Sequence, residues 1–266
     1  MEVHRLRVAG VVLALAWAGL AAGCGGADEP AAPNAASAIA AEEPEALEQP
    51  EAVTNPKPAK PETLRLLDGG NPTVFVRLGQ EVELFDEPGG ALVETVGHAT
   101  EFGSRTVFAV TEQRGNWVSV STAFTENGRP LWLELDPELL RAGRSEWEIE
   151  VDLSDYRADL FLDGKRVRSF AVSIGMPSAP TPTGRFAVTD TFRGGLNAAY
   201  GCCAVALTAR QSNLPSGWLG GDRIAIHGTT GPLSSMVSHG CVRAADADVS
   251  DLVDKVPPGT PVTIRQ

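Results

Sequence analysis

Residues 224–243 read Ile-Ala-Ile-His-Gly-Thr-Thr-Gly-Pro-Leu-Ser-Ser-Met-Val-Ser-His-Gly-Cys-Val-Arg. They contain two of the four histidines of the chain, His227 and His239, and one of its four cysteines, Cys241. The alternating isoleucines at the start predict a short, half-buried strand that ends near His227. A thiol, an imidazole that takes its proton and backbone N–H groups that hold an oxyanion are the parts that cysteine nucleophiles use. The stretch therefore predicts a catalytic cysteine site.

The same stretch resembles the signature of the YkuD-type L,D-transpeptidases, which are cell-wall enzymes. Their pattern is His-Gly, a loop of variable length, then Ser or Thr followed by His-Gly-Cys, a hydrophobic residue and Asn or Arg. This chain fills the pattern with His227-Gly228 and Ser238-His239-Gly240-Cys241-Val242-Arg243, joined by a short loop. A second block typical of the family, Thr181-Pro-Thr-Gly184 before a strand at 185–188, extends the resemblance over roughly residues 146–264.

The resemblance implies a role for each residue of the motif. Cys241 is the nucleophile, and His227 is favoured over His239 as the base because it ends a strand and matches the family's proton-transfer position. The oxyanion and substrate-binding set comprises Gly228, Ser238, His239, Gly240 and Arg243. Backbone N–H groups of Gly240 and Cys241 are the expected oxyanion donors. Arg243 pairs with a substrate carboxylate or forms a structural salt bridge.

The family reaction uses the tetrapeptide stem of peptidoglycan and needs no cofactor. The thiol attacks the third residue of one stem, releases D-Ala, and passes the acyl group to the side-chain amine of another stem. Two alternatives keep the same site, an L,D-carboxypeptidase with water as acceptor and an enzyme that attaches proteins to the wall. A third alternative is a wall-binding protein with an inert catalytic domain.

Two further interpretations of the cysteine compete with catalysis. A lone cysteine is usually a small buried hydrophobe. His227, His239 and Cys241 are also acceptable zinc ligand types, although no paired spacing such as Cys-x-x-Cys supports a metal site. We therefore expect no metal.

The whole chain has 266 residues and a net charge of −12, which excludes the basic surface that nucleic-acid binding needs. Residues 1–24 resemble a bacterial lipoprotein signal, with a basic start, an apolar run over 8–22 and a lipid-accepting Cys24. The sequence departs from the usual box by having Ala21 where leucine is common. Ordinary signal cleavage or a retained anchor are the alternatives. We expect an extracytoplasmic monomer held at the membrane by this lipid and facing the wall.

Residues 25–63 predict a disordered linker. Seven prolines, eleven alanines and eight acidic residues occur there, with almost no branched aliphatic side chains. Such a composition buries too little apolar surface to offset chain entropy.

The fold class expected for the rest is mainly β. Residues 64–144 show short strand-like runs between turns and resemble SH3-like β-barrel modules in layout. Their Trp117 and Trp132 either line a groove for a wall peptide or are buried aromatics. Residues 145–266 form the catalytic domain, a β-sandwich with few short helices. Apolar and acidic residues alternate over 148–153, which predicts a strand, and Asp163-Gly164 predicts a hairpin turn. A helix is expected near 246–256, where two prolines end it.

Two adjacent cysteines, Cys202 and Cys203, remain once Cys24 and Cys241 are assigned. Export permits disulfides, so a vicinal disulfide and a pair of buried thiols are both open. A bond from either cysteine to Cys241 would switch the enzyme off.

Overall fold

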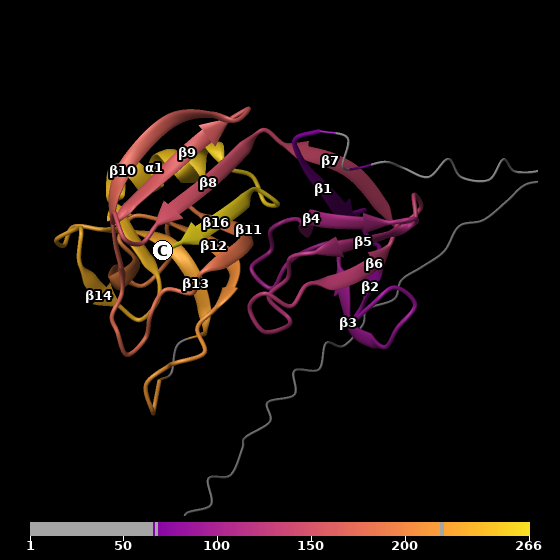
Figure 1. The fold of residues 1–266 in the computed structure, drawn as a ribbon, viewed down its shortest axis with the longest axis horizontal. Coiled ribbons are helices and arrows are strands. Elements are labelled where there is room, and N and C mark those ends of the chain that lie inside the picture. The colour runs from indigo at the N-terminus through magenta and orange to yellow at the C-terminus, as the bar shows by residue number, and fades with distance from the viewer. Residues whose placement is uncertain (1–65, 67–68, 219–220) are drawn as a thin grey trace, which may run out of the picture. The chain divides into compact units, whose positions relative to one another are not determined.

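The structure is a computed structural model that describes residue 66, residues 69–218 and residues 221–266 (Figure 1). The expected signal segment 1–24 with Cys24, and the expected linker 25–63, lie outside the described residues. Everything described belongs to one compact unit, residues 56–266. None of the helices in this described part is long and apolar enough to cross a membrane.

The first sheet is antiparallel and follows the order β3-β2-β6-β5-β4-β1-β7. Its strands are β1 Asn71–Val76, β2 Glu81–Phe85, β3 Leu92–Gly97, β4 Val107–Arg114, β5 Trp117–Val120, β6 Leu131–Glu134 and β7 Leu140–Ser145. The core uses the apolar positions of the predicted runs, among them Val74, Leu84, Val118 and Leu131. Trp132 is buried, whereas Trp117 is half-buried and packs edge-on against Phe85 with ring centroids 5.4 Å apart. The likeness to SH3-like modules stays an expectation.

Strands β3 and β7 were not predicted. Both are edge strands of the sheet. Four of the six residues of β3 are exposed, and β7 carries arginines. An edge strand can be held by its backbone ladder with little apolar alternation, so the sequence carried no period-two signal for either strand.

The second sheet follows the order β14-β10-β15-β13-β12-β11-β16-β8-β9, and an additional β9–β10 pairing closes eight of these strands into a barrel. Its elements are β8 Trp147–Asp152, β9 Arg157–Leu162, β10 Lys165–Gly175, β11 Gly184–Phe192, β12 Ala204–Arg210, β13 Arg223–Thr229, β14 Met236–Ser238, β15 Val242–Ala245, β16 Pro261–Arg265, the 3₁₀ turn η1 Ala198–Tyr200 and the helix α1 Asp246–Lys255. The two faces expected of a sandwich are thus one continuous sheet. The mainly β class and the scarcity of helices are confirmed.

The predicted hairpin at Asp163-Gly164 is confirmed. Both residues have positive φ, 48° and 71°, as the two central residues of a type I′ turn require. Strands β9 and β10 pair on either side of it, with Leu162 opposite Lys165.

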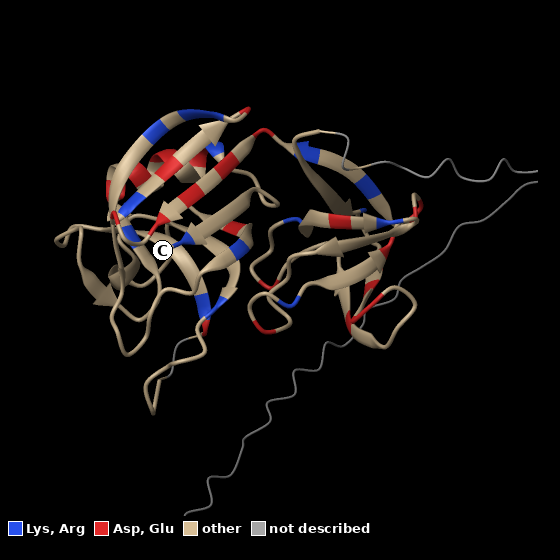
Figure 2. Cartoon of the chain, viewed as in Figure 1, with Lys and Arg blue, Asp and Glu red and all other residues tan. Residues whose placement is uncertain are grey.

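Helix α1 buries Val249, Leu252 and Val253, as its predicted apolar stripe requires. Its N-cap is Ala245, which provides no side-chain hydrogen bond. Asp246 and Asp248 do lie in the first turn, where negative charge favours the helix dipole. Asp248 is also paired with Arg168 of β10 at 2.6 Å. Figure 2 shows acidic residues in red along α1.

Candidate active site

The stretch at residues 224–243 forms two neighbouring parallel strands and the loop between them. Strand β13 pairs with β15, so that Ile226 lies opposite Val242 and His227 opposite Arg243. Cys241 immediately precedes β15, so the chain order and the strand pairing bring it to the end of the strand next to that of His227. Cys241 is half-buried and is the free cysteine among the described residues.

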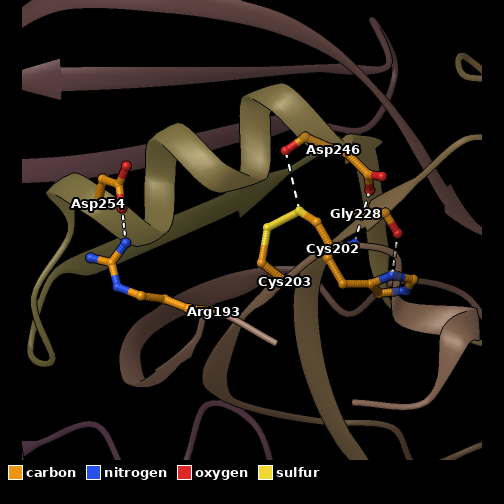
Figure 3. The surroundings of a disulfide bond; sticks show 7 residues. Arg193, Cys202, Cys203, Gly228, Asp246 and Asp254 are labelled. Atoms are coloured by element: carbon orange, nitrogen blue, oxygen red, sulfur yellow. Dashed lines mark hydrogen bonds and ion pairs between the residues drawn. A yellow bond between two sulfur atoms is a disulfide. The ribbon is translucent and has the colours of Figure 1, made fainter. Parts of the chain in front are cut away.

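His227 is held by its own chain. The ring is 3% exposed, and its Nδ1 lies 2.9 Å from the carbonyl oxygen of Gly228. Because a carbonyl can only accept, Nδ1 carries the proton in this contact. The orienting group, which could not be assigned from the sequence, is therefore the backbone carbonyl of Gly228 (Figure 3).

Burial shifts both reacting groups toward their neutral forms. It lowers the pKa of His227 below its ordinary value; the Arg243 charge lowers it further, while the carbonyls of Gly228 and Tyr200 oppose the shift. Burial raises the pKa of the Cys241 thiol, and the Ala225 N–H and the Arg243 charge only partly offset this. The resting site therefore favours a neutral thiol and a neutral imidazole, because a desolvated ion pair is costly.

The turn before Cys241 is closed by Ser238. Its side chain is buried, and its Oγ donates to the carbonyl of Cys241 at 2.5 Å and accepts the N–H of Gly240 at 3.1 Å. The Gly240 N–H is thus engaged inside the loop, and the expectation of a free oxyanion donor at this position is corrected. Gly240 has φ +111°, which favours glycine.

His239 and Arg243 face different surroundings. The imidazole of His239 is half-buried and packs on the ring of Trp218, with centroids 5.0 Å apart. Arg243 forms no ion pair with any described residue, and its buried Nε has no hydrogen-bond partner among them. The structural salt bridge considered for Arg243 is therefore not formed.

The first residue of helix α1, Asp246, packs closely against Gly228. The N–H of Gly228 donates to the carbonyl of Cys203 at 3.0 Å, and a Cβ at this position would lie 2.2 Å from Oδ1 of Asp246. The same carboxylate accepts the N–H of Cys202 at 3.1 Å, as Figure 3 shows. Close packing of this turn against the strand carrying His227 accounts for the glycine, so Gly228 is a backbone element of the site.

Cys202 and Cys203 form a vicinal disulfide. Of the two states left open by the sequence, the oxidised one is present, and neither cysteine is bonded to Cys241. Sγ of Cys202 lies 3.3 Å from the carbonyl oxygen of Asp246. The disulfide is thus built into the turn that leads from η1 to the site.

The zinc alternative does not fit the geometry. No group of three His, Cys, Asp or Glu side chains among residues 66, 69–218 and 221–266 converges closely enough to hold a metal ion. His227, His239 and Cys241 therefore do not form a ligand set.

Four site residues were missed in the sequence: Tyr200, Gln211, Trp218 and Asp246. The Tyr200 ring lies 5.0 Å from that of His227, and its pKa is raised by burial and by the Cys241 thiolate charge, which places the phenol near the thiol. These residues come from η1, two loops and the first turn of α1. No local spacing links them to the His-Gly-Cys motif, so only the fold brings them to it.

Comparison with known proteins defines the class. Residues 146–264 match the family model of the YkuD L,D-transpeptidase catalytic domain. The chain therefore contains a YkuD L,D-transpeptidase catalytic domain at residues 146–264.

Parts of the chain are similar to individual known proteins. The YkuD protein of Bacillus subtilis (strain 168) is 30% identical over 126 residues, which span 45% of this chain and 66% of that relative. The structure of an L,D-transpeptidase from Stackebrandtia nassauensis is similar with 22% identity, a TM-score of 0.35 and coverage of 47% of this chain and 57% of that one. An L,D-transpeptidase from Mycobacterium smegmatis shows 15% identity, a TM-score of 0.39 and coverage of 60% and 90%. The assignment rests on the sequence matches.

Proposed function

We propose that this protein is a peptidoglycan L,D-transpeptidase that works through a cysteine thioester. One observation carries the proposal: His227, with Nδ1 fixed by the Gly228 carbonyl, lies on β13, and the free Cys241 immediately precedes β15, the strand that pairs with β13. A base on one strand and a nucleophile at the start of the neighbouring strand, with the base held by a third group, is an arrangement that can activate a thiol.

In the first half of the proposed reaction, the tetrapeptide stem is the acyl donor. Nε2 of His227 takes the thiol proton as Sγ of Cys241 bonds to the carbonyl carbon of the third stem residue. The negative charge on the carbonyl oxygen is held by backbone N–H groups, chiefly that of Cys241. The C–N bond to the terminal D-Ala then breaks, the imidazolium returns its proton to the leaving amine, and a thioester remains.

In the second half, the side-chain amine of another stem attacks the thioester. His227 takes a proton from that amine, Sγ leaves and is reprotonated, and the product is a cross-link between two third residues. Buried, neutral resting groups suit this scheme, because charge appears only while the bond is being made.

The remaining motif residues support this chemistry. Arg243, which has no carboxylate partner among the described residues, is proposed to pair with a carboxylate of the stem. Ser238 and Gly240 shape the turn that presents Cys241, and His239 with Trp218 forms part of the cleft wall. Gly228 orients the base through its carbonyl.

The rest of the proposal concerns the location of the enzyme. The lipoprotein-like residues 1–24 support attachment through Cys24, with residues 25–63 as a tether, 64–144 as an SH3-like module and 145–266 as the catalytic domain. On this proposal the enzyme faces the wall from the membrane surface as a monomer.

Products from defined tetrapeptide muropeptides, identified by mass spectrometry, test the function. A dimer with the mass of two stems less one D-Ala is the expected product. A tripeptide monomer would instead identify a carboxypeptidase. Attachment of the stem only to an added wall protein would identify a protein-attachment enzyme. Unchanged substrate with intact, folded protein would contradict the catalytic proposal.

A further inference from the structure

Gln211 is a buried polar residue beside the nucleophile turn, outside the family motif. It follows β12, and its side chain is only 6% exposed. Its backbone N–H donates to the carbonyl of Asp222 at 2.7 Å. A buried amide is costly unless its polar atoms are paired, so the partners of Gln211 indicate what it does.

The amide of Gln211 joins three loops. Its Nε2 donates to the carbonyls of Pro180 at 2.9 Å and His239 at 3.1 Å, and its Oε1 accepts the N–H of Asn213 at 2.9 Å. The reversed amide would place an oxygen against two carbonyls and a nitrogen against an N–H group. The hydrogen-bond pattern therefore fixes the orientation of the amide.

The bond to His239 fixes a peptide plane. In a trans peptide the C=O and N–H groups point in opposite directions. With the His239 carbonyl turned to Gln211, the N–H of Gly240 points to Oγ of Ser238, which donates to the carbonyl of Cys241. Hydrogen bonds thus hold both the His239–Gly240 peptide and the Cys241–Val242 peptide. The peptide between them, Gly240–Cys241, contains the Cys241 N–H.

Contact distances show that Gln211 also fits against Gly240. A Cβ on Gly240 would lie 2.3 Å from Nε2 of Gln211 and 2.9 Å from Cδ1 of Ile224. Together with φ +111° at Gly240, this packing leaves the turn little freedom while Gln211 is in place.

We propose that Gln211 is a positioning residue for acyl transfer: its amide holds the His239–Gly240 peptide so that the Cys241 N–H faces the oxyanion. The inference rests on the cysteine mechanism proposed above. Without this amide, the His239–Gly240 peptide can rotate, and the oxyanion donor loses its fixed direction. Gln211 does not touch the sulfur, so the reactivity of the thiol itself does not depend on it.

Two variants and two reagents test this. Gln211→Met keeps the length but removes the donors, and Gln211→Glu presents a carboxylate oxygen to the Pro180 and His239 carbonyls at pH 8. A carbapenem acylates Cys241 through an oxyanion, whereas iodoacetamide alkylates a thiol without one. We expect the maximal acylation rate of both variants to fall about tenfold or more, within the scale of losing one oxyanion donor. The half-saturating carbapenem concentration and the alkylation rate should change less than about threefold.

The pH dependence of the acylation rate separates the proposed role from a general loosening of the turn around Gly240. Protonated Gln211→Glu regains one donor, so its acylation rate relative to the unmodified enzyme should recover by about threefold or more between pH 8 and pH 5. The Gln211→Met ratio should stay constant. Gln80→Glu, the same change at an exposed position, is the control and should behave as the unmodified enzyme.

Three outcomes would overturn the inference. They are unchanged acylation of both variants, a parallel loss of acylation and alkylation, and a pH-independent ratio for Gln211→Glu. Failure of the proposed function looks different: the unmodified enzyme would show no carbapenem adduct on Cys241 at all.

Discussion

Replacing each site histidine by alanine separates the base from its neighbour. With the thiol pKa raised above its ordinary 9.0, fewer than about one molecule in a hundred is a thiolate at pH 7 unless a base helps. His227→Ala should therefore acylate with a carbapenem at about 1% of the normal rate or less at pH 7. Its rate should rise about tenfold per pH unit until the thiol titrates, because hydroxide then replaces the missing base.

The unmodified enzyme should behave differently. Burial lowers the pKa of His227 below the ordinary 6.5, and the base acts only when neutral. Its acylation rate should therefore stay flat near neutrality and fall only below pH 6.5.

His239→Ala removes the contact with Trp218 and should retain acylation within about tenfold, without a new pH dependence. His98→Ala, immediately after β3, is the matched control. Stopped-flow fluorescence and adduct mass measure each rate. Full acylation of His227→Ala with none for His239→Ala would refute the assignment of the base.

Three other outcomes are expected. Cys241→Ala and Cys241→Ser should both abolish turnover with an unchanged circular dichroism spectrum, and EDTA should have no effect; loss in EDTA restored by zinc would instead favour a metal mechanism. Truncation to residue 64 should leave activity on soluble muropeptides unchanged, and palmitate labelling should disappear in Cys24→Ala; a tenfold fall in activity would contradict the tether interpretation. Asp246→Ala leaves the Cys202 N–H without its acceptor and should reduce the free energy of unfolding by about 1–3 kcal/mol in urea titration. The control is Asp254→Ala, also on α1, which breaks an exposed ion pair with Arg193 (Figure 3) and should reduce the free energy of unfolding by less than about 1 kcal/mol. Equal losses for the two variants would contradict the packing role of Asp246.

Much of the chemistry follows from the amino-acid sequence. The motif at His227 and Cys241 and the block at 181–184 indicated the family because enzymes of one mechanism place their nucleophile and base in a fixed local pattern. Strands with one buried face, such as β8, were predicted because alternation records burial directly. The helix near 246–256 was predicted for the same reason, although its cap was not.

Other features depended on contacts between distant segments. Edge strands β3 and β7 carry no period-two pattern, so they appear only when the sheet is formed. The closure of the barrel depends on pairing between β9 and β10 in addition to β8 and β9.

The finer site also belongs to tertiary structure. The sequence predicted Cys241 as the nucleophile and His227 as the base. The fold determined that both rest in neutral forms, because burial is a property of everything packed around them. It also brought Tyr200 to the base and Gln211 to the nucleophile turn. No sequence spacing predicts either contact. The hydrogen bond from Gln211 to His239 joins segments 28 residues apart, so it forms only when the strands align.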